Sequence, residues 1–133
     1  MPRTEVYFYQ ESQIDVPVWD WPRALKRNDR KALIRCLAKI GALRLLGYEL
    51  RRPNADFLRD GIYELRVRRG NVNYRILYFF HGQNIALLAN GLTKEARVPS
   101  IEIERAIARR KRYEQNPLRH RATIQVPEDA DDV

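Results

Sequence analysis

Residues 61–113 are GIYELRVRRGNVNYRILYFFHGQNIALLANGLTKEARVPSIEIERAIARRKRY, and this stretch decides the fold. Apolar and charged side chains alternate over 62–69, as expected for a strand with one face in the core. After a turn at Gly70, residues 72–80 predict a returning antiparallel strand. The run 85–92 is apolar on both faces, which is typical of a central strand.

The last part of this stretch predicts a helix that begins at Pro99. Acidic residues stand near its start and basic residues near its end, as the helix dipole favours. The two strands expected over 62–69 and 72–80 carry Arg66 and Arg68, both on the charged face of the first strand, and Arg75 on the second. Cations held on a rigid surface suit a polyanion, and RNA is the leading candidate.

The N-terminal third predicts a strand at 5–10 and two helices. Asp20 caps a short helix that ends near Lys26, and Asn28 with Asp29 caps a second helix that Gly47 closes. Its apolar face is expected to hold Leu33, Ile34, Leu37, Ala38, Gly41 and Leu45. We expect close packing on the sheet to explain Gly41, and the single cysteine, Cys36, to lie in the core.

Residues 49–61 are expected to link helix and sheet without forming an element. Beyond Pro117 the chain is polar and acidic at its end, which predicts a mobile tail. The domain organisation expected is therefore one domain over 1–117, with a tail over 118–133.

The charge is +8 overall, and residues 51–121 hold 16 lysines and arginines against 7 aspartates and glutamates, a net charge of +9. Such a field attracts nucleic acid, and attracts it less as salt rises. No apolar run approaches the roughly 20 residues of a membrane span, and the start lacks a signal peptide, so a cytoplasmic protein is expected. One cysteine and two histidines give no metal-ligand cluster, and neither a metal nor a cofactor is expected.

The strand block ELRVRRGNVNYRILYFF, the loop LTKEARVP and the helix IEIERAIARRKRY together resemble the RelE/ParE superfamily of toxins, most closely its phage-derived, HigB-like branch. The resemblance covers about residues 4–115. It implies an α+β fold, with a small, curved, mainly antiparallel sheet, two N-terminal helices on one face and a C-terminal helix. It also implies a toxin that is neutralised by a helix-turn-helix antitoxin and that reaches DNA only within the antitoxin complex.

The same resemblance implies a metal-independent endoribonuclease that cuts messenger RNA on the ribosome. Arginine suits this chemistry because its planar fork can hold two oxygens of a phosphate whose charge grows in the transition state. The family pattern places catalytic cations at Arg66, Arg75 and Lys94. Further residues expected to contact RNA or the ribosome are Arg68, Arg69, Arg97, Arg109, Arg110, Lys111 and Arg112.

Several alternatives stay open. Arg66 and Arg68 can instead form a solvated sheet face that pairs with Glu64, and Arg75 can anchor the sheet through a carboxylate. The general base is unassigned among Lys94, Glu64 and Tyr113. His81 is expected to be a polar turn residue, and His120 to lie in the tail.

Two other functions share the expected fold. A ParE-like protein inhibits DNA gyrase by binding, without catalysis. An inactive toxin-like protein acts only as the partner of its antitoxin in repression. Glu95 permits this last function, because it stands where the family often has a second lysine.

Overall fold

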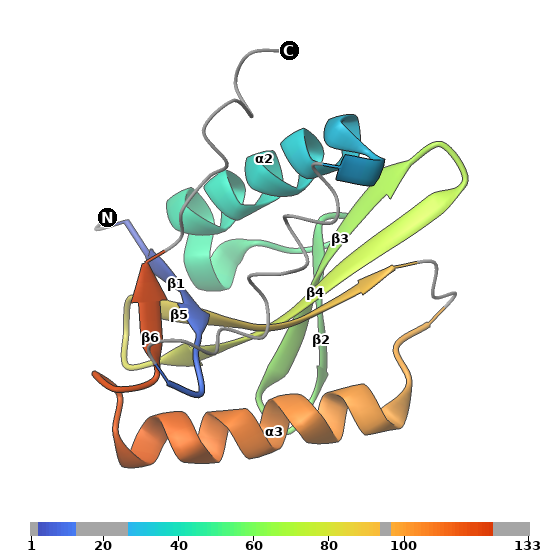
Figure 1. Cartoon of the computed structure of the whole chain (residues 1–133). Coiled ribbons are helices and arrows are strands. Elements are labelled where there is room, and N and C mark those ends of the chain that lie inside the picture. Colours follow the sequence, from blue (N-terminus) through green and yellow to red (C-terminus); the bar gives the residue numbers. More distant parts are fainter. Residues whose placement is uncertain (1–2, 13–26, 94–96, 124–133) are drawn as a thin grey trace.

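The chain folds as an α+β protein with a six-stranded mixed sheet that does not close (Figure 1). The computed structural model describes residues 3–12, 27–93 and 97–123. The described elements, in chain order, are β1 (Glu5–Tyr9), α2 (Arg30–Leu46), the 3-10 turn η1 (Gly47–Glu49), β2 (Ala55–Arg59), β3 (Ile62–Arg69), β4 (Val72–His81), β5 (Ile85–Thr93), α3 (Ser100–Gln115) and β6 (Arg121–Thr123).

The strands are ordered β2-β3-β4-β5-β1-β6 across the sheet. β1 runs parallel to β5, and the other four pairings are antiparallel. β5 is therefore a central strand, as its apolar sequence predicts. None of the helices in the described ranges is long and apolar enough to cross a membrane.

The two long helices cover opposite faces of the sheet (Figure 1). α2 packs on one face, where Leu33, Cys36 and Ile40 meet strand residues such as Leu65 and Ile76. α3 packs on the other face with Ile103, Ala106 and Tyr113. The first of the two expected N-terminal helices falls at 20–26, outside the described residues.

The buried face of α2 differs in part from the expected one. The buried residues of α2 are Ala32, Leu33, Cys36, Ile40 and Leu43. Leu37 packs partly against them, but Ala38 is exposed and Leu45 is 62% exposed. A Cβ at Gly41 would meet nothing within 4 Å, so the expected close packing there is wrong. The helix has apolar residues on two neighbouring stripes, and spacing alone does not decide which stripe meets the sheet.

The start of α2 is fixed by Asp29, as the sequence predicts. Its carboxylate accepts a hydrogen bond from the backbone N–H of Ala32 at 3.1 Å, which satisfies one of the donors left free in the first turn. The same carboxylate accepts from Tyr74 Oη at 3.2 Å and from Arg69 Nε at 3.4 Å. Asp29 thereby ties the start of the helix to the end of β3 and the start of β4.

Two segments expected to lack structure belong to the sheet. The expected linker 49–61 begins at the last residue of η1 and contains β2, which pairs with β3 through the turn at Asp60 and Gly61. Gly61 has φ +80°, a left-handed conformation that favours glycine, and a Cβ there would displace the guanidinium of Arg110.

The chain after Pro117 also returns to the sheet, and the expectation of a tail is wrong for 118–123. β6 pairs with β1, and the buried His120 places Nδ1 2.8 Å from the carbonyl oxygen of Gln10. Three residues are too few to show an alternating pattern, and for this reason the sequence does not reveal β6. Residues 124–133 lie outside the described part.

Candidate nucleic-acid interface

A block of four charged side chains lies on the face of the sheet that α3 covers. The strand register places Arg66 directly opposite Arg75, and Asp56 directly opposite Glu64. Because successive side chains of a strand alternate between faces, all four project to the same side. The structure therefore brings together two of the three predicted catalytic residues.

Glu64 lies between the two arginines and is only 1% exposed. Its carboxylate accepts hydrogen bonds from Arg75 Nη1 at 2.9 and 2.8 Å and from Arg66 Nε at 2.6 Å. A buried carboxylate is stable only when it is paired and hydrogen-bonded, and these contacts provide both. The ion pairs considered as alternatives for Arg66 and Arg75 are thus present.

Asp56 extends the network to the edge of the sheet. It accepts from Arg52 Nη2 at 2.7 Å and from Arg66 Nη2 at 3.3 Å. The hydrogen bond from Arg52 is the main reason that the pKa of Asp56 lies below its ordinary value. Charges of opposite sign alternate from Arg52 through Asp56, Arg66 and Glu64 to Arg75, and this chain of contacts fixes the two catalytic candidates in orientation.

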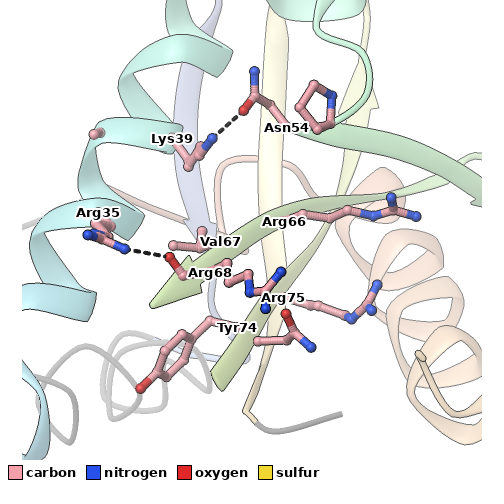
Figure 2. A pocket seen from close by; sticks show the side chains of 11 residues that line it. Arg35, Lys39, Asn54, Arg66, Val67, Arg68, Tyr74 and Arg75 are labelled. Atoms are coloured by element: carbon pink, nitrogen blue, oxygen red, sulfur yellow. Dashed lines mark hydrogen bonds between the residues drawn. The ribbon is translucent and has the colours of Figure 1, made fainter. Parts of the chain in front are cut away.

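The arginines line a hollow of about 490 Å³ at the margin of the sheet (Figure 2). The pairing of β2 with β3 stops at Ala55 and Leu65, followed by one hydrogen bond from Arg66 N to Asn54 O at 2.8 Å. β3 continues to Arg69 past this point, and the hollow lies along its exposed edge, between α2 and the linker before β2. Its lining residues are Arg35, Ala38, Lys39, Pro53, Asn54, Arg66, Val67, Arg68, Asn73, Tyr74 and Arg75.

Access to the two arginines differs. The side chain of Arg66 is 37% exposed, whereas that of Arg75 is 13% exposed. A bound phosphate would therefore meet Arg66 first and approach Arg75 from within the hollow. Arg68, also predicted as an RNA contact, is exposed at the same hollow and donates from Nε to the carbonyl oxygen of Gly70 at 2.9 Å.

The other predicted residues lie outside this hollow or outside the described residues. Arg69 points to the start of α2, where it pairs with Asp29. Arg97 is exposed just before α3. Lys94, the third predicted catalytic residue, falls in 94–96, which the structure does not describe, and the same holds for Glu95.

Three of the four basic residues near the end of α3 have partners within the protein. Arg109 donates to Ala89 O at 2.7 Å and to the side chain of Asn90 at 2.5 Å, and burial lowers the pKa of Arg109. Arg110 donates to the carbonyl oxygen of Asp60 at 3.0 Å. Arg112 donates to Tyr9 Oη and pairs with Glu11 at 2.9 Å, and only Lys111 projects to solvent without such a contact among the described residues.

Tyr113, another candidate for the general base, does not join the arginine block. Tyr113 is fully buried, accepts a hydrogen bond from Arg121 Nη2 at 2.7 Å and packs against the rings of Phe79 and His81. Phe79 lies four residues beyond Arg75 on β4, which corresponds to roughly 13 Å along a strand. Tyr113 therefore packs α3 on the sheet at the end of β4 that lies away from Arg75.

Sequence reasoning missed Arg35 and Lys39, which reach the hollow from α2 (Figure 2). Arg35 Nη1 donates to Arg68 O at 2.8 Å, and Lys39 Nζ donates to the side-chain oxygen of Asn54. The two residues are four apart, so they share one face of the helix. That spacing was the available signal, but it identifies only a basic helix face until the sheet edge beside it is known.

Two comparisons with known proteins bear on this site. Residues 20–111 match the model of a family described as "Phage derived protein Gp49-like (DUF891)". The match spans all of α2, the strands β2 to β5 and most of α3, and so includes every arginine that lines the hollow. No curated protein matches the chain in sequence.

Proposed function

We propose that this chain, which belongs to the phage-derived Gp49-like family of the RelE/ParE-like toxin superfamily, is the toxin of a type II toxin-antitoxin system that cleaves messenger RNA on the ribosome. Family membership supports a toxin with an antitoxin partner. The arginine block supports cleavage of RNA as the mode of action.

The observation that carries the proposal is the pairing of Arg66 with Arg75 across β3 and β4 at the wall of a basic hollow. Cleavage by attack of the RNA 2′-hydroxyl on the adjacent phosphate forms a strongly anionic, five-coordinate transition state. Guanidinium groups that are already oriented stabilise this charge without reorganising as it develops. Glu64 and Asp56 hold both groups in place.

Each arginine has a distinct role in this proposal. Arg66, the more exposed, binds the incoming phosphate, and Arg75 offers its fork to the oxygens that gain charge during the attack. Arg68 binds the neighbouring backbone. Lys94 belongs to the same constellation by the family pattern, and the ribosome supplies orientation of the message.

The three candidates for proton transfer differ in their surroundings. Both oxygens of Glu64 accept from guanidinium groups, so Glu64 serves better as a positioning residue than as a base. Tyr113 is buried at the opposite end of β4. Lys94 is the candidate among the three that neither of these observations disfavours.

One observation favours a second candidate function. Glu64 holds both arginines as a phosphate would, and a toxin-like protein that has lost catalysis could keep this ion-pair network for stability alone. Such a protein would act as the partner of its antitoxin in repression. It would not arrest growth when produced alone.

Induction without antitoxin, followed by pulse labelling, tests the proposal. We expect growth to stop and protein synthesis to fall before DNA synthesis, because a ribosome-dependent nuclease removes messages and leaves DNA topology unchanged. DNA synthesis that falls first would place the protein with the gyrase inhibitors. Undisturbed growth would favour the inactive partner.

A further inference from the structure

The hollow beside β3 contains three cations whose charge no carboxylate balances. Arg35 donates to Arg68 O, Lys39 to the amide oxygen of Asn54, and Arg68 Nε to the carbonyl oxygen of Gly70. All three acceptors are neutral. Over residues 3–12, 27–93 and 97–123, none of the three cations forms an ion pair, and no acidic residue lines the hollow.

These three cations contrast with the arginine block at the same hollow. Arg66 and Arg75 share the charge of Glu64, so part of their field is cancelled inside the protein. Arg35, Lys39 and Arg68 keep their full charge while neutral acceptors restrict their positions. A concave surface lined by charge of one sign concentrates its field and attracts counter-ions into it.

The shape of the hollow limits what can enter it. At about 490 Å³ it has the size of a small-molecule site, which suits a nucleotide or so of single strand better than a duplex. It runs from α2, which carries Arg35 and Lys39, around the free edge of β3 to Arg66 and Arg75 (Figure 2). A nucleic-acid strand that lies in the hollow would thus pass from one face of the sheet to the other.

We infer that this hollow holds the phosphodiester backbone of single-stranded RNA next to the cleaved position, with Arg35 and Lys39 of α2 as phosphate ligands. The inference rests on the proposed function, which makes RNA the substrate. It adds a second contact region on the α2 side of the sheet, away from the face that carries the scissile phosphate.

The test measures binding of a 2′-O-methylated single-stranded oligoribonucleotide by fluorescence anisotropy between about 50 and 200 mM salt. Arg35→Gln with Lys39→Gln removes two charges from the hollow. The matched control is Lys31→Gln with Arg44→Gln, which removes two charges from exposed positions on the same helix that do not line the hollow. Melting temperatures confirm that both variants are folded.

Each phosphate contact on a single strand contributes about 0.7 to the slope of log affinity against log salt, so we expect the hollow variant to lose about 1.4 and the control to keep the wild-type slope. If the double variant does not fold, Lys39→Gln alone should lose about 0.7. Equal slopes for the hollow and control variants would overturn the inference. Wild-type binding of poly-L-glutamate as tight as binding of the RNA would also overturn it, because the hollow would then accept any acidic polymer.

The methylated probe separates this inference from the proposed function, because it has no 2′-hydroxyl to attack its phosphate. If the salt slopes of the two variants differ as expected but the protein cuts no message, the inference stands and the nuclease proposal is contradicted. If the protein cuts messages but the hollow and control variants have equal salt slopes, only the inference is contradicted.

Discussion

Arg75 Nη1 lies 2.9 Å from one oxygen of Glu64 and 2.8 Å from the other, and the carboxylate is buried while the arginine borders the hollow. This one ion pair both joins β3 to β4 and orients the guanidinium of Arg75. In the proposed mechanism, stability and catalysis are therefore coupled at Arg75, and a test of either must control for the other.

Replacing Glu64 by glutamine should destabilise the fold. The change removes the negative charge between Arg66 and Arg75, which then repel each other across the strand pair. Loss of hydrogen bonds to a charged group costs about 1.5–3 kcal/mol, to be measured by urea unfolding. Asp60→Asn, which breaks an exposed ion pair with Arg59, is the control and should change stability by less than about 0.5 kcal/mol. Equal stability of the two variants would show that the buried pair contributes nothing.

Replacing Asp29 by alanine should cost about 1 kcal/mol, the usual value of a helix cap, whereas Asp29→Asn keeps a capping oxygen and isolates the charge. Burial tends to raise the pKa of Asp29, but hydrogen bonds from the Ala32 N–H and Tyr74, with the charge of Arg69, leave it lowered. A lowered folded-state pKa stabilises the fold above the unfolded value of about 3.9, and this contribution disappears as the pH falls through the folded value. The gap in unfolding free energy between wild type and Asp29→Asn should therefore narrow between pH 7 and pH 3. A constant gap would mean that the ionised carboxylate has no role.

Cys36 should not react with Ellman's reagent in the native protein at neutral to mildly alkaline pH. It is 1% exposed, and burial raises the pKa of its thiol to about 12. The reactive species is the thiolate, so raising the pKa from about 8.5 alone slows the reaction roughly 10³-fold. Reaction in guanidinium chloride provides the control. Rapid labelling of the native protein would show that the α2 core opens readily.

Arg109 and Lys111 should differ although both are expected RNA contacts. Arg109→Ala removes the donor to Ala89 O and Asn90, and buried acceptors left without partners cost about 1–3 kcal/mol. Lys111→Ala should change stability by less than about 0.5 kcal/mol. Thermal melting measures both, and a stable Arg109→Ala variant would return Arg109 to the set of surface cations.

The three long strands and α2 were predictable because each has a local signal. Alternation marks β3 and β4, an apolar run marks β5, and Asp29 and Gly47 mark the ends of α2. β2 and β6 carry weak patterns of their own and form because neighbouring strands offer them an edge. Their placement depends on tertiary contacts that no local window contains.

The candidate site shows the same division. Alternation assigns Arg66 and Arg75 each to one face of its own strand, but the register that makes them direct neighbours on a common face could not be read from either strand alone. The burial of Glu64 between them requires that register. Arg35 and Lys39 can be placed at the hollow only when the packing of α2 beside β3 is known. The sequence leaves that packing undetermined because α2 has two apolar stripes.

Cleavage of a ribosome-bound message by purified protein tests the central claim most directly. Glu64→Gln with Arg75→Gln exchanges the Arg75–Glu64 ion pair for a neutral, hydrogen-bonding pair, and Arg66 keeps its ion pair with Asp56. Stability and ribosome binding, measured alongside, should therefore stay near wild type. We expect the wild type to cut the message, and the paired variant to cut it on the order of 10²–10³-fold more slowly, as when one preorganised donor is lost. A folded, ribosome-bound paired variant that cuts as fast as the wild type would contradict the assignment of Arg75 to the scissile phosphate.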